Sequence, residues 1–325
     1  LVESMDLSAF NSAAKPLLAD FNQDGKSEIY LGNEIFQFNF TNPTAPTLFR
    51  VISGTPGPTG TQFDTPFSIA ADLLDIADCG GDPDCEGLEI AAGNVIYSVD
   101  INPFDGDAVE MKPMRDLNLL SPQVPPFSFE DGKTSVADID QDGILDVAVA
   151  GGADSDFGVY AWNKNGLIQI FPIPAPLIQQ TSLVSIANVY DDKLSGGFFD
   201  WPELIVGVAD KMYAFNLNAA FQNPADPYWW VIPVADNTSV NPATFFDFNK
   251  DGLAEIVTRD RDSLRIVYGG PAPFPPGVNA NRNWSALKAE SGTLDEYPIV
   301  ADVDNDEQAE IIVAGGHTES SNDVI

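Results

Sequence analysis

The 325-residue sequence is poor in basic side chains, with 15 against 49 acidic ones and a formal net charge of −34. Such a chain repels nucleic-acid phosphates and anionic lipid headgroups, so we expect neither nucleic acid as a partner nor membrane insertion. There is one histidine, His317, and no recognisable Ser-His-Asp set for nucleophilic catalysis. No hydrophobic stretch is long enough to span a membrane. We therefore expect a binding protein and not an enzyme.

Acidic residues, in contrast, are abundant and crowded. The stretch "ADIDQDGILDVAVAGG" brings Asp138, Asp140, Asp142 and Asp146 together, where they repel one another unless a cation is present. Calcium takes six to eight oxygen ligands, and D-x-D-x-D-G is also how an EF-hand loop begins. An EF-hand needs a glutamate at its twelfth position, which here is Val149. Because both flanks read as strands, the stretch predicts a calcium loop between two antiparallel strands.

The same pattern begins again at Asp20, Asp247 and Asp302, also without a glutamate at the twelfth position. In each loop we expect the first, third, fifth and ninth residues to supply side-chain oxygens and the seventh a backbone carbonyl. The expected ligands are Asp20, Asn22, Asp24, Lys26 and Glu28; Asp138, Asp140, Asp142, Ile144 and Asp146; Asp247, Asn249, Asp251, Leu253 and Glu255; and Asp302, Asp304, Asp306, Gln308 and Glu310. About four calcium ions are predicted. The alternative is that these are solvated turn residues.

Two further loops depart from the pattern. The loop that begins at Asp72 is longer and holds the only two cysteines, Cys79 and Cys85. Their C-x5-C spacing predicts a small disulfide, with two free thiols as the alternative, and an even cysteine count favours an oxidising compartment. Asp72 and Glu89 are candidate ligands of a fifth ion, although their register is unclear. In the loop that begins at Asn188 we expect weak binding or none.

The six loops begin at positions 20, 72, 138, 188, 247 and 302, so they recur every 50 to 66 residues. Repeats of this size with several short strands each predict a β-propeller. We expect an all-β chain forming a single domain over residues 1–325, with four-stranded antiparallel blades and a calcium loop between the first and second strands of each. Six loops imply at least six blades, and we favour seven. We expect the chain to be a segment of a longer protein.

The D-x-[DN]-x-D-x-x-x-[DE] loops resemble the FG-GAP and VCBS repeats, which are calcium-binding blades of integrin alpha subunits and of bacterial surface proteins. The stretch "YPIVADVDNDEQAEIIVAGG" is similar to secreted proteins of the Bacteroidota. Three loops keep the family's glycine, and Glu307 replaces it in the fourth. The resemblance implies an extracellular or cell-surface adhesion module whose protein or glycan ligand binds the face opposite the calcium loops. The alternative is a carbohydrate-active propeller, either a lectin or a polysaccharide lyase. The oligomeric state is not predicted.

Overall fold

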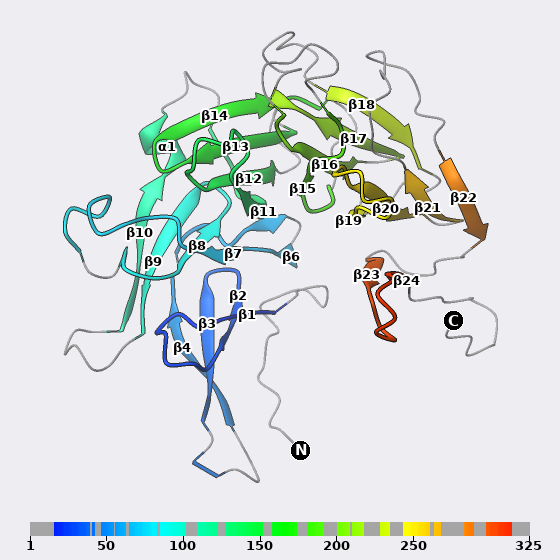
Figure 1. Cartoon of the computed structure of the whole chain (residues 1–325). Coiled ribbons are helices and arrows are strands. Elements are labelled where there is room, and N and C mark those ends of the chain that lie inside the picture. The colour runs from blue at the N-terminus through cyan, green and yellow to red at the C-terminus, as the bar shows by residue number, and fades with distance from the viewer. Residues whose placement is uncertain are drawn as a thin grey trace. The chain divides into compact units, whose positions relative to one another are not determined.

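Nearly all the regular secondary structure of the described residues consists of short β-strands. A computed structural model describes residues 16–39, 41–42, 47–54, 56–62, 65–82, 85–101, 109–121, 128–151, 158–173, 181–191, 200–208, 210–217, 228–234, 243–260, 263–267, 283–288 and 297–313 (Figure 1). Five four-stranded sheets follow one another along the sequence, each with its strands in chain order. One short helix, α1 (Leu117–Leu120), follows the second sheet. Within these ranges, no helix is long and apolar enough to cross a membrane.

The first three sheets share one strand order. The first sheet contains β1 (Leu17–Ala19), β2 (Glu28–Leu31), β3 (Glu34–Asn39) and β4 (Thr47–Ser53). The second contains β7 (Ile69–Ala71), β8 (Glu89–Ala92), β9 (Val95–Asp100) and β10 (Glu110–Asp116). The third contains β11 (Gly132–Ala137), β12 (Asp146–Gly151), β13 (Val159–Asn163) and β14 (Gly166–Phe171). Between the first two sheets lies a small ribbon of β5 (Thr61–Gln62) and β6 (Thr65–Pro66).

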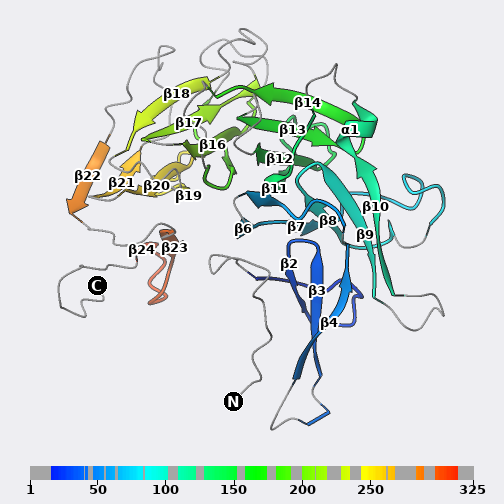
Figure 2. The ribbon, with the colours of Figure 1, turned by 180° about the vertical axis from the view of Figure 1, so that it is seen from behind.

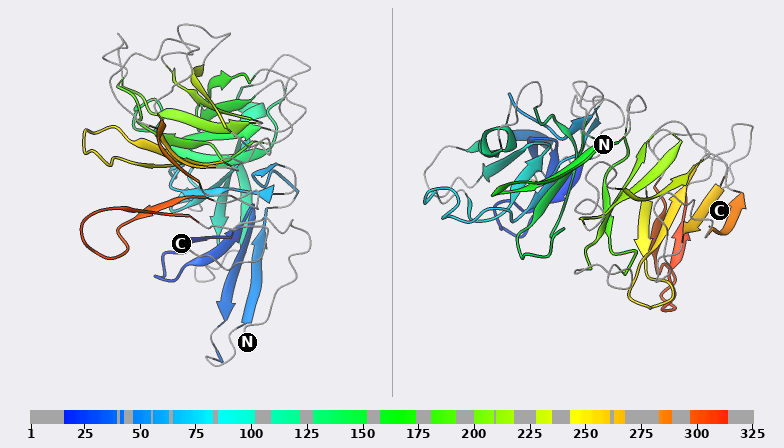
Figure 3. Two further views of the ribbon diagram at one scale, coloured as in Figure 1. Left: turned by 90° about the vertical axis from the view of Figure 1, so that its right-hand side faces the viewer. Right: turned by 90° about the horizontal axis from the view of Figure 1, so that it is seen from above.

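The remaining strands repeat the arrangement, which can also be followed in Figure 2 and Figure 3. The fourth sheet contains β15 (Ser185–Ala187), β16 (Glu203–Val208), β17 (Lys211–Phe215) and β18 (Tyr228–Pro233). The fifth contains β19 (Ala243–Phe246), β20 (Glu255–Arg259), β21 (Ser263–Val267) and β22 (Asn283–Lys288). A last antiparallel pair is β23 (Ile299–Ala301) with β24 (Glu310–Ile312). The predicted all-β class and four-stranded antiparallel sheets are confirmed, while the propeller ring and its blade count stay predictions.

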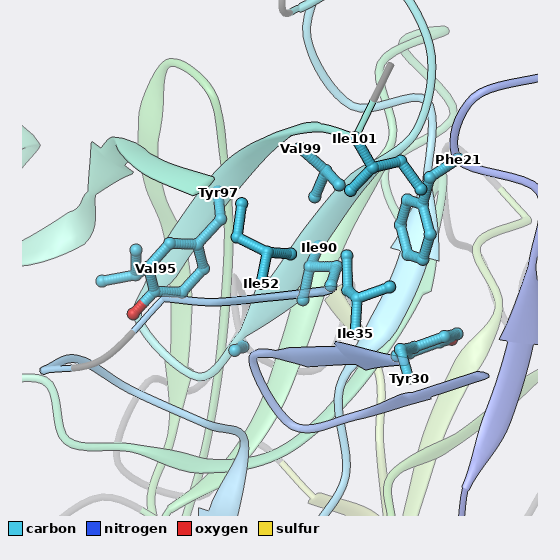
Figure 4. Close-up of a cluster of buried hydrophobic side chains, with 10 residues drawn as sticks. Phe21, Tyr30, Ile35, Ile52, Ile90, Val95, Tyr97, Val99 and Ile101 are labelled. Carbon is cyan, nitrogen blue, oxygen red and sulfur yellow. The ribbon is translucent and has the colours of Figure 1, made fainter. Parts of the chain in front are cut away.

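The chain forms two compact units, the first built on the first two sheets and most of the third. Its core joins the first and second sheets, with Ile35 and Ile52 of one sheet packed with Ile90 and Tyr97 of the other (Figure 4). Several middle strands are covered on both faces, since every residue of β9, β12, β13 and β16 is buried. This burial explains why these strands read as largely apolar runs in the sequence.

The second compact unit is built on the fourth and fifth sheets and has a core of the same kind. Ile205 and Met212 of the fourth sheet pack with Ile256 and Val267 of the fifth, and all four are buried. In both units, therefore, a sheet buries one face against its neighbour in sequence. A single four-stranded sheet cannot bury both faces by itself, so each repeat depends on the next one.

Edge strands carry one extra residue in four of the sheets. The ladder registers place Val51 as the extra residue in β4, Met114 in β10 and Trp229 in β18. The pairing of β22 with β21 shifts in the same way. An extra residue on one strand is a β-bulge, which bends the strand and increases its twist.

Candidate metal centres in the acidic loops

Each acidic loop joins the first and second strands of its sheet, as the sequence predicts. The loop that begins at Asp138 leaves β11 after Ala137 and enters β12 at Asp146, and these two flanking residues pair across the ladder. The other regular loops are closed by the pairs Ala19 with Glu28, Phe246 with Glu255, and Ala301 with Glu310. The ninth-position acid therefore lies at the base of the loop, on the first residue of the second strand.

Two backbone positions in each regular loop adopt the left-handed conformation. The fourth-position φ values are 55° at Gln23, 58° at Gln141, 60° at Lys250 and 64° at Asn305. The sixth-position values are 83° at Gly25, 89° at Gly143, 92° at Gly252 and 69° at Glu307. Glycine adopts this conformation without steric cost, so the fourth loop bears a local strain where Glu307 replaces glycine. All four loops nevertheless share one backbone path.

Side-chain oxygens turn inward over this path. Asp20 accepts hydrogen bonds from the backbone N–H groups of Asp24 (3.1 Å) and Gly25 (2.9 Å). Asp247 and Asp302 accept from the same two positions of their own loops, at 3.1 and 2.8 Å and at 3.1 and 2.9 Å. The third-position oxygens of Asn22, Asp140 and Asn249 each accept from the fifth-position N–H, at 3.1, 3.1 and 2.8 Å. The hydrogen bonds within each loop thus line it with oxygens.

Carboxylates converge most closely in two of the loops. Asp138, Asp140 and Asp146 each place an oxygen within 4.8 Å of the other two, and Asp302, Asp304 and Asp306 do the same. Oxygens this close can share one calcium ion, whose bonds to oxygen are 2.3–2.6 Å long. One oxygen of Asp138, Oδ1, is buried and has no hydrogen-bond partner. These two loops therefore fit a hard divalent cation best.

Not every predicted ligand joins these groups. Asp142 and Glu310 lie outside the two sets of converging carboxylates. The loops that begin at Asp20 and Asp247 have asparagine at the third position, and within the described ranges they form no group of three close carboxylates. Their amide oxygens are still suitable ligands for calcium, but each contributes no charge. We therefore rank these two loops below the other two as cation sites.

The acid that begins the second strand, which is the ninth residue of a regular loop, also has a role within the sheet that the sequence did not reveal. It accepts a hydrogen bond from the N–H of the second loop residue, which closes the loop onto the strand. The donors and acceptors are Phe21 to Glu28 (3.0 Å), Leu73 to Glu89 (2.8 Å), Val189 to Glu203 (2.9 Å), Phe248 to Glu255 (2.9 Å) and Val303 to Glu310 (2.9 Å). The contact recurs in the two loops that depart from the sequence pattern, so it belongs to the repeat itself. Burial raises the pKa of Glu28 and of Glu255 above the usual range.

A third-strand amide supports this acid in three sheets. The donors are Gln37 to Glu28 (3.1 Å), Asn163 to Asp146 (2.9 Å) and Asn216 to Glu203 (2.9 Å). In the second sheet Ile90 pairs with Tyr97, which places Ser98 across from Glu89. The fully buried Glu89 is left with one oxygen, Oε1, that has no hydrogen-bond partner. Burial raises the pKa of Glu89 to about 7.

The loop between β7 and β8 is held by a covalent bond. Cys79 and Cys85 form the predicted disulfide, with their Cα atoms 6.3 Å apart. Three basic side chains bind the acids of this loop: Lys164 Nζ lies 2.5 Å from Asp78 Oδ2, Lys112 Nζ lies 3.4 Å from Asp82 Oδ2, and Arg115 Nη2 lies 3.9 Å from Asp78 Oδ1. Asp72 and Glu89, the candidate ligands of a fifth ion, belong to no group of three converging acids in the described part of the chain.

A tryptophan side chain helps to hold the loop between β15 and β16 in place. The buried Trp201 donates through Nε1 to the backbone carbonyl of Asp140 (2.9 Å), and Asn188 Nδ2 donates to Asp200 Oδ2 (3.2 Å). Residues 192–199 of this loop lie outside the described residues. The expectation of weak ion binding at Asn188 stays a prediction.

Comparison with known proteins gives distant structural similarity only. No protein-family model matches the chain, and no curated protein matches it. The fold is similar to that of the V. cholerae biofilm matrix protein Bap1, with a TM-score of 0.50 and 14% identity over 93% of this chain and 66% of that one. A lectin of Agrocybe aegerita that recognises non-reducing terminal N-acetylglucosamine has a TM-score of 0.44 and 14% identity over 86% of this chain and 66% of that one. The chain thus spans 66% of the length of both proteins.

Proposed function

We propose that the chain is a calcium-stabilised β-propeller that serves as a binding or adhesion module outside the cell. The observation that carries the proposal is the convergence of Asp138, Asp140 and Asp146 in a loop whose backbone is already wound around their oxygens. Three carboxylates so close together are stable when a divalent cation cancels their charge. The FG-GAP and VCBS resemblance of the sequence assigns the same loops to calcium.

The propeller part of the proposal is supported by the repeat. Five sheets have the same strand order, and in each compact unit a sheet packs against its neighbour in sequence. Short repeats that bury a face against the next repeat are typical of propellers. We propose six or more blades, with seven favoured.

The adhesion part is supported by what the loops are able to do. A calcium ion coordinated by one loop acts on the scaffold, and its ligands leave little room for substrate chemistry. The disulfide and the acidic surface agree with an extracellular protein, where calcium is abundant. Bap1 is described as a biofilm matrix protein. For this chain we propose a binding role without catalysis, with a protein or glycan bound at the face opposite the calcium loops.

Calcium binding is tested by elemental analysis of the purified chain after dialysis against trace calcium, followed by thermal unfolding with calcium, with magnesium and with chelator. We expect more than one bound calcium per chain and a melting temperature that calcium raises more than magnesium does. A chain that retains no calcium and melts at the same temperature in chelator contradicts the proposal.

Ligand binding is tested on glycan arrays and on cell-surface extracts in the presence of calcium. Binding that is kept by the calcium-replete chain and lost on chelation supports an adhesion module. Release of unsaturated product from a polyuronate would place the protein among the lyases.

A further inference from the structure

An open cavity of about 360 Å³ lies at the disulfide loop of the second sheet. Its apolar lining comes from Leu74, Ile76, Ala77 and Cys85. Leu74 and Cys85 are 2% and 1% exposed and form the floor, whereas Ile76 is 39% exposed and stands at the mouth. A cavity of this size is at the small end of ligand pockets, and an apolar floor suits a hydrocarbon chain.

The polar part of the lining is entirely acidic. The carboxylates of Asp72, Asp75 and Glu86 line the same cavity, and all three residues are exposed. The cavity therefore combines an apolar floor with strong negative potential.

The same loop already binds ammonium groups. Lys164 Nζ lies 2.5 Å from Asp78 and 3.6 Å from Asp75, and Lys112 Nζ lies 3.4 Å from Asp82. The hydrogen bond to Asp78 raises the pKa of Lys164, so its charge is retained. Among the described residues, these ion pairs engage Asp78 and Asp82, whereas the only acid of the cavity with such a contact is Asp75, through its longer distance to Lys164.

A metal ion fits this cavity poorly. Within the described ranges, groups of three acids that converge within 4.8 Å occur only in the loops of Asp138 and Asp302. The carboxylates of Asp72, Asp75 and Glu86 form no such group, and calcium requires six to eight oxygens at 2.3–2.6 Å. A larger cation with an apolar body fits both the spread of the charges and the floor beneath them.

We propose that this cavity binds an alkylammonium group, namely the lysine side chain of a protein partner. The four-carbon stem lies on Leu74 and Ile76, and the ammonium group reaches the carboxylates of Asp72 and Glu86. An amino sugar carries hydroxyl groups in place of an apolar stem, so it matches the floor less well. The proposal does not rest on calcium binding in the regular loops, and it adds a contact distinct from the ligand face proposed above, because the disulfide loop, like the calcium loops, joins the first and second strands of its sheet.

The probe is Nα-acetyl-lysine N-methylamide, titrated into the ¹⁵N-labelled chain at low ionic strength with calcium present to keep any calcium-dependent fold intact. We expect the amide resonances of Leu74, Ile76 and Gly87 to shift with the probe. The Nε-acetylated analogue keeps the stem but lacks the charge, and it should bind at least about tenfold more weakly.

Variants separate the cavity from general charge attraction. Glu86→Gln should weaken probe binding about threefold, as expected for one exposed ion pair, and Ile76→Ser should weaken it by removing apolar surface at the mouth of the cavity. Asp210→Asn is the matched control, since it removes one charge from a side chain that is 62% exposed in the turn between β16 and β17, and it should leave binding unchanged.

Three results would overturn the proposal. One is an equal loss of binding in Asp210→Asn and Glu86→Gln, which would indicate non-specific attraction. Another is displacement of the probe by excess calcium at the same resonances, which would make the cavity a metal site. The last is binding of glucosamine as tight as that of the lysine derivative, which would remove the reason to expect a protein partner. Failure here leaves the calcium proposal intact, because that proposal is judged by elemental analysis.

Discussion

Replacing Asp140 by asparagine tests the cation site at its most crowded point. Asparagine keeps the oxygen that accepts from the Asp142 N–H, and Asn22 makes the equivalent hydrogen bond in the first sheet. The substitution therefore removes charge while the loop geometry is retained. Without an ion, Asp140 is repelled by Asp138 and Asp146, whose oxygens lie within 4.8 Å. Each repulsion is at least about 0.9 kcal/mol in water and is reduced by salt.

In chelator, Asp140→Asn should thus raise the free energy of unfolding by about 1 kcal/mol, because it relieves two repulsions. Calcium at about 1 mM stabilises a site with a Kd of about 0.1 mM by about 1.4 kcal/mol. If the substitution weakens the affinity about tenfold, that calcium increment falls to about 0.4 kcal/mol. For 325 residues, the lost 1 kcal/mol corresponds to a calcium-induced shift in melting temperature smaller by about 1.5 °C.

The assay is thermal unfolding of wild type, Asp140→Asn and the control Asp210→Asn, each with calcium and with chelator. The decisive quantity is the calcium-induced shift in each protein. Asp210→Asn should keep the wild-type calcium-induced shift in melting temperature, since the Asp210 carboxylate lies outside the acidic loops. If Asp140→Asn destabilises the chain in chelator and keeps the full calcium shift, the three carboxylates do not surround a common ion and the reasoning fails.

The reciprocal change, Asn22→Asp, should increase the calcium-induced shift in melting temperature and lower stability in chelator, because it adds a charge to the first loop; equal shifts in both proteins would argue against an ion there. The Cys79→Ala/Cys85→Ala double variant should lose about 2 kcal/mol of unfolding free energy in urea, the loss expected for so short a loop, and an unchanged urea midpoint would contradict this. In the folded state the pKa of Glu89 is raised from 4.5 to about 7. Between these values the folded state holds a proton that the unfolded state releases. The resulting contribution to the free energy of unfolding is full below pH 4.5 and is lost as the pH rises through 7. In chelator, Glu89→Gln should therefore flatten the dependence of stability on pH between those values by up to about 3 kcal/mol, and equal slopes for both proteins would disprove the burial argument.

Much of the fold was predictable because its signals are local. The alternation of acids in the loop that begins at Asp138, followed by an apolar run, marks a loop and a buried strand within sixteen residues. The disulfide was predictable for the same reason, since Cys79 and Cys85 are six positions apart. Short-range patterns of this kind depend on chemistry that adjacent residues complete by themselves.

Contacts set by sheet register could not be predicted in this way. The amide that supports the ninth-position acid comes from a third strand, and Asn216 is thirteen residues from Glu203. Lys164 is 86 residues from Asp78, so its role in the disulfide loop depends on how the second and third sheets meet. Gln37 lies on the third strand of its sheet and Asn216 directly follows the third strand of its own, each opposite the acid that begins the second strand. They could have been identified from the sequence only if the lengths of the hairpins between these strands were known.

The bulged edge strands bear on how the chain behaves when it is crowded. Unpaired edges are where β-proteins join one another, and a local twist makes a strand a poor template for the next molecule. The extra residues in β4, β10 and β18 therefore act against fibre formation at high protein concentration. Contacts between copies of this chain would then run through side chains and bound ligands, which can be reversed, and not through shared backbone ladders, which persist.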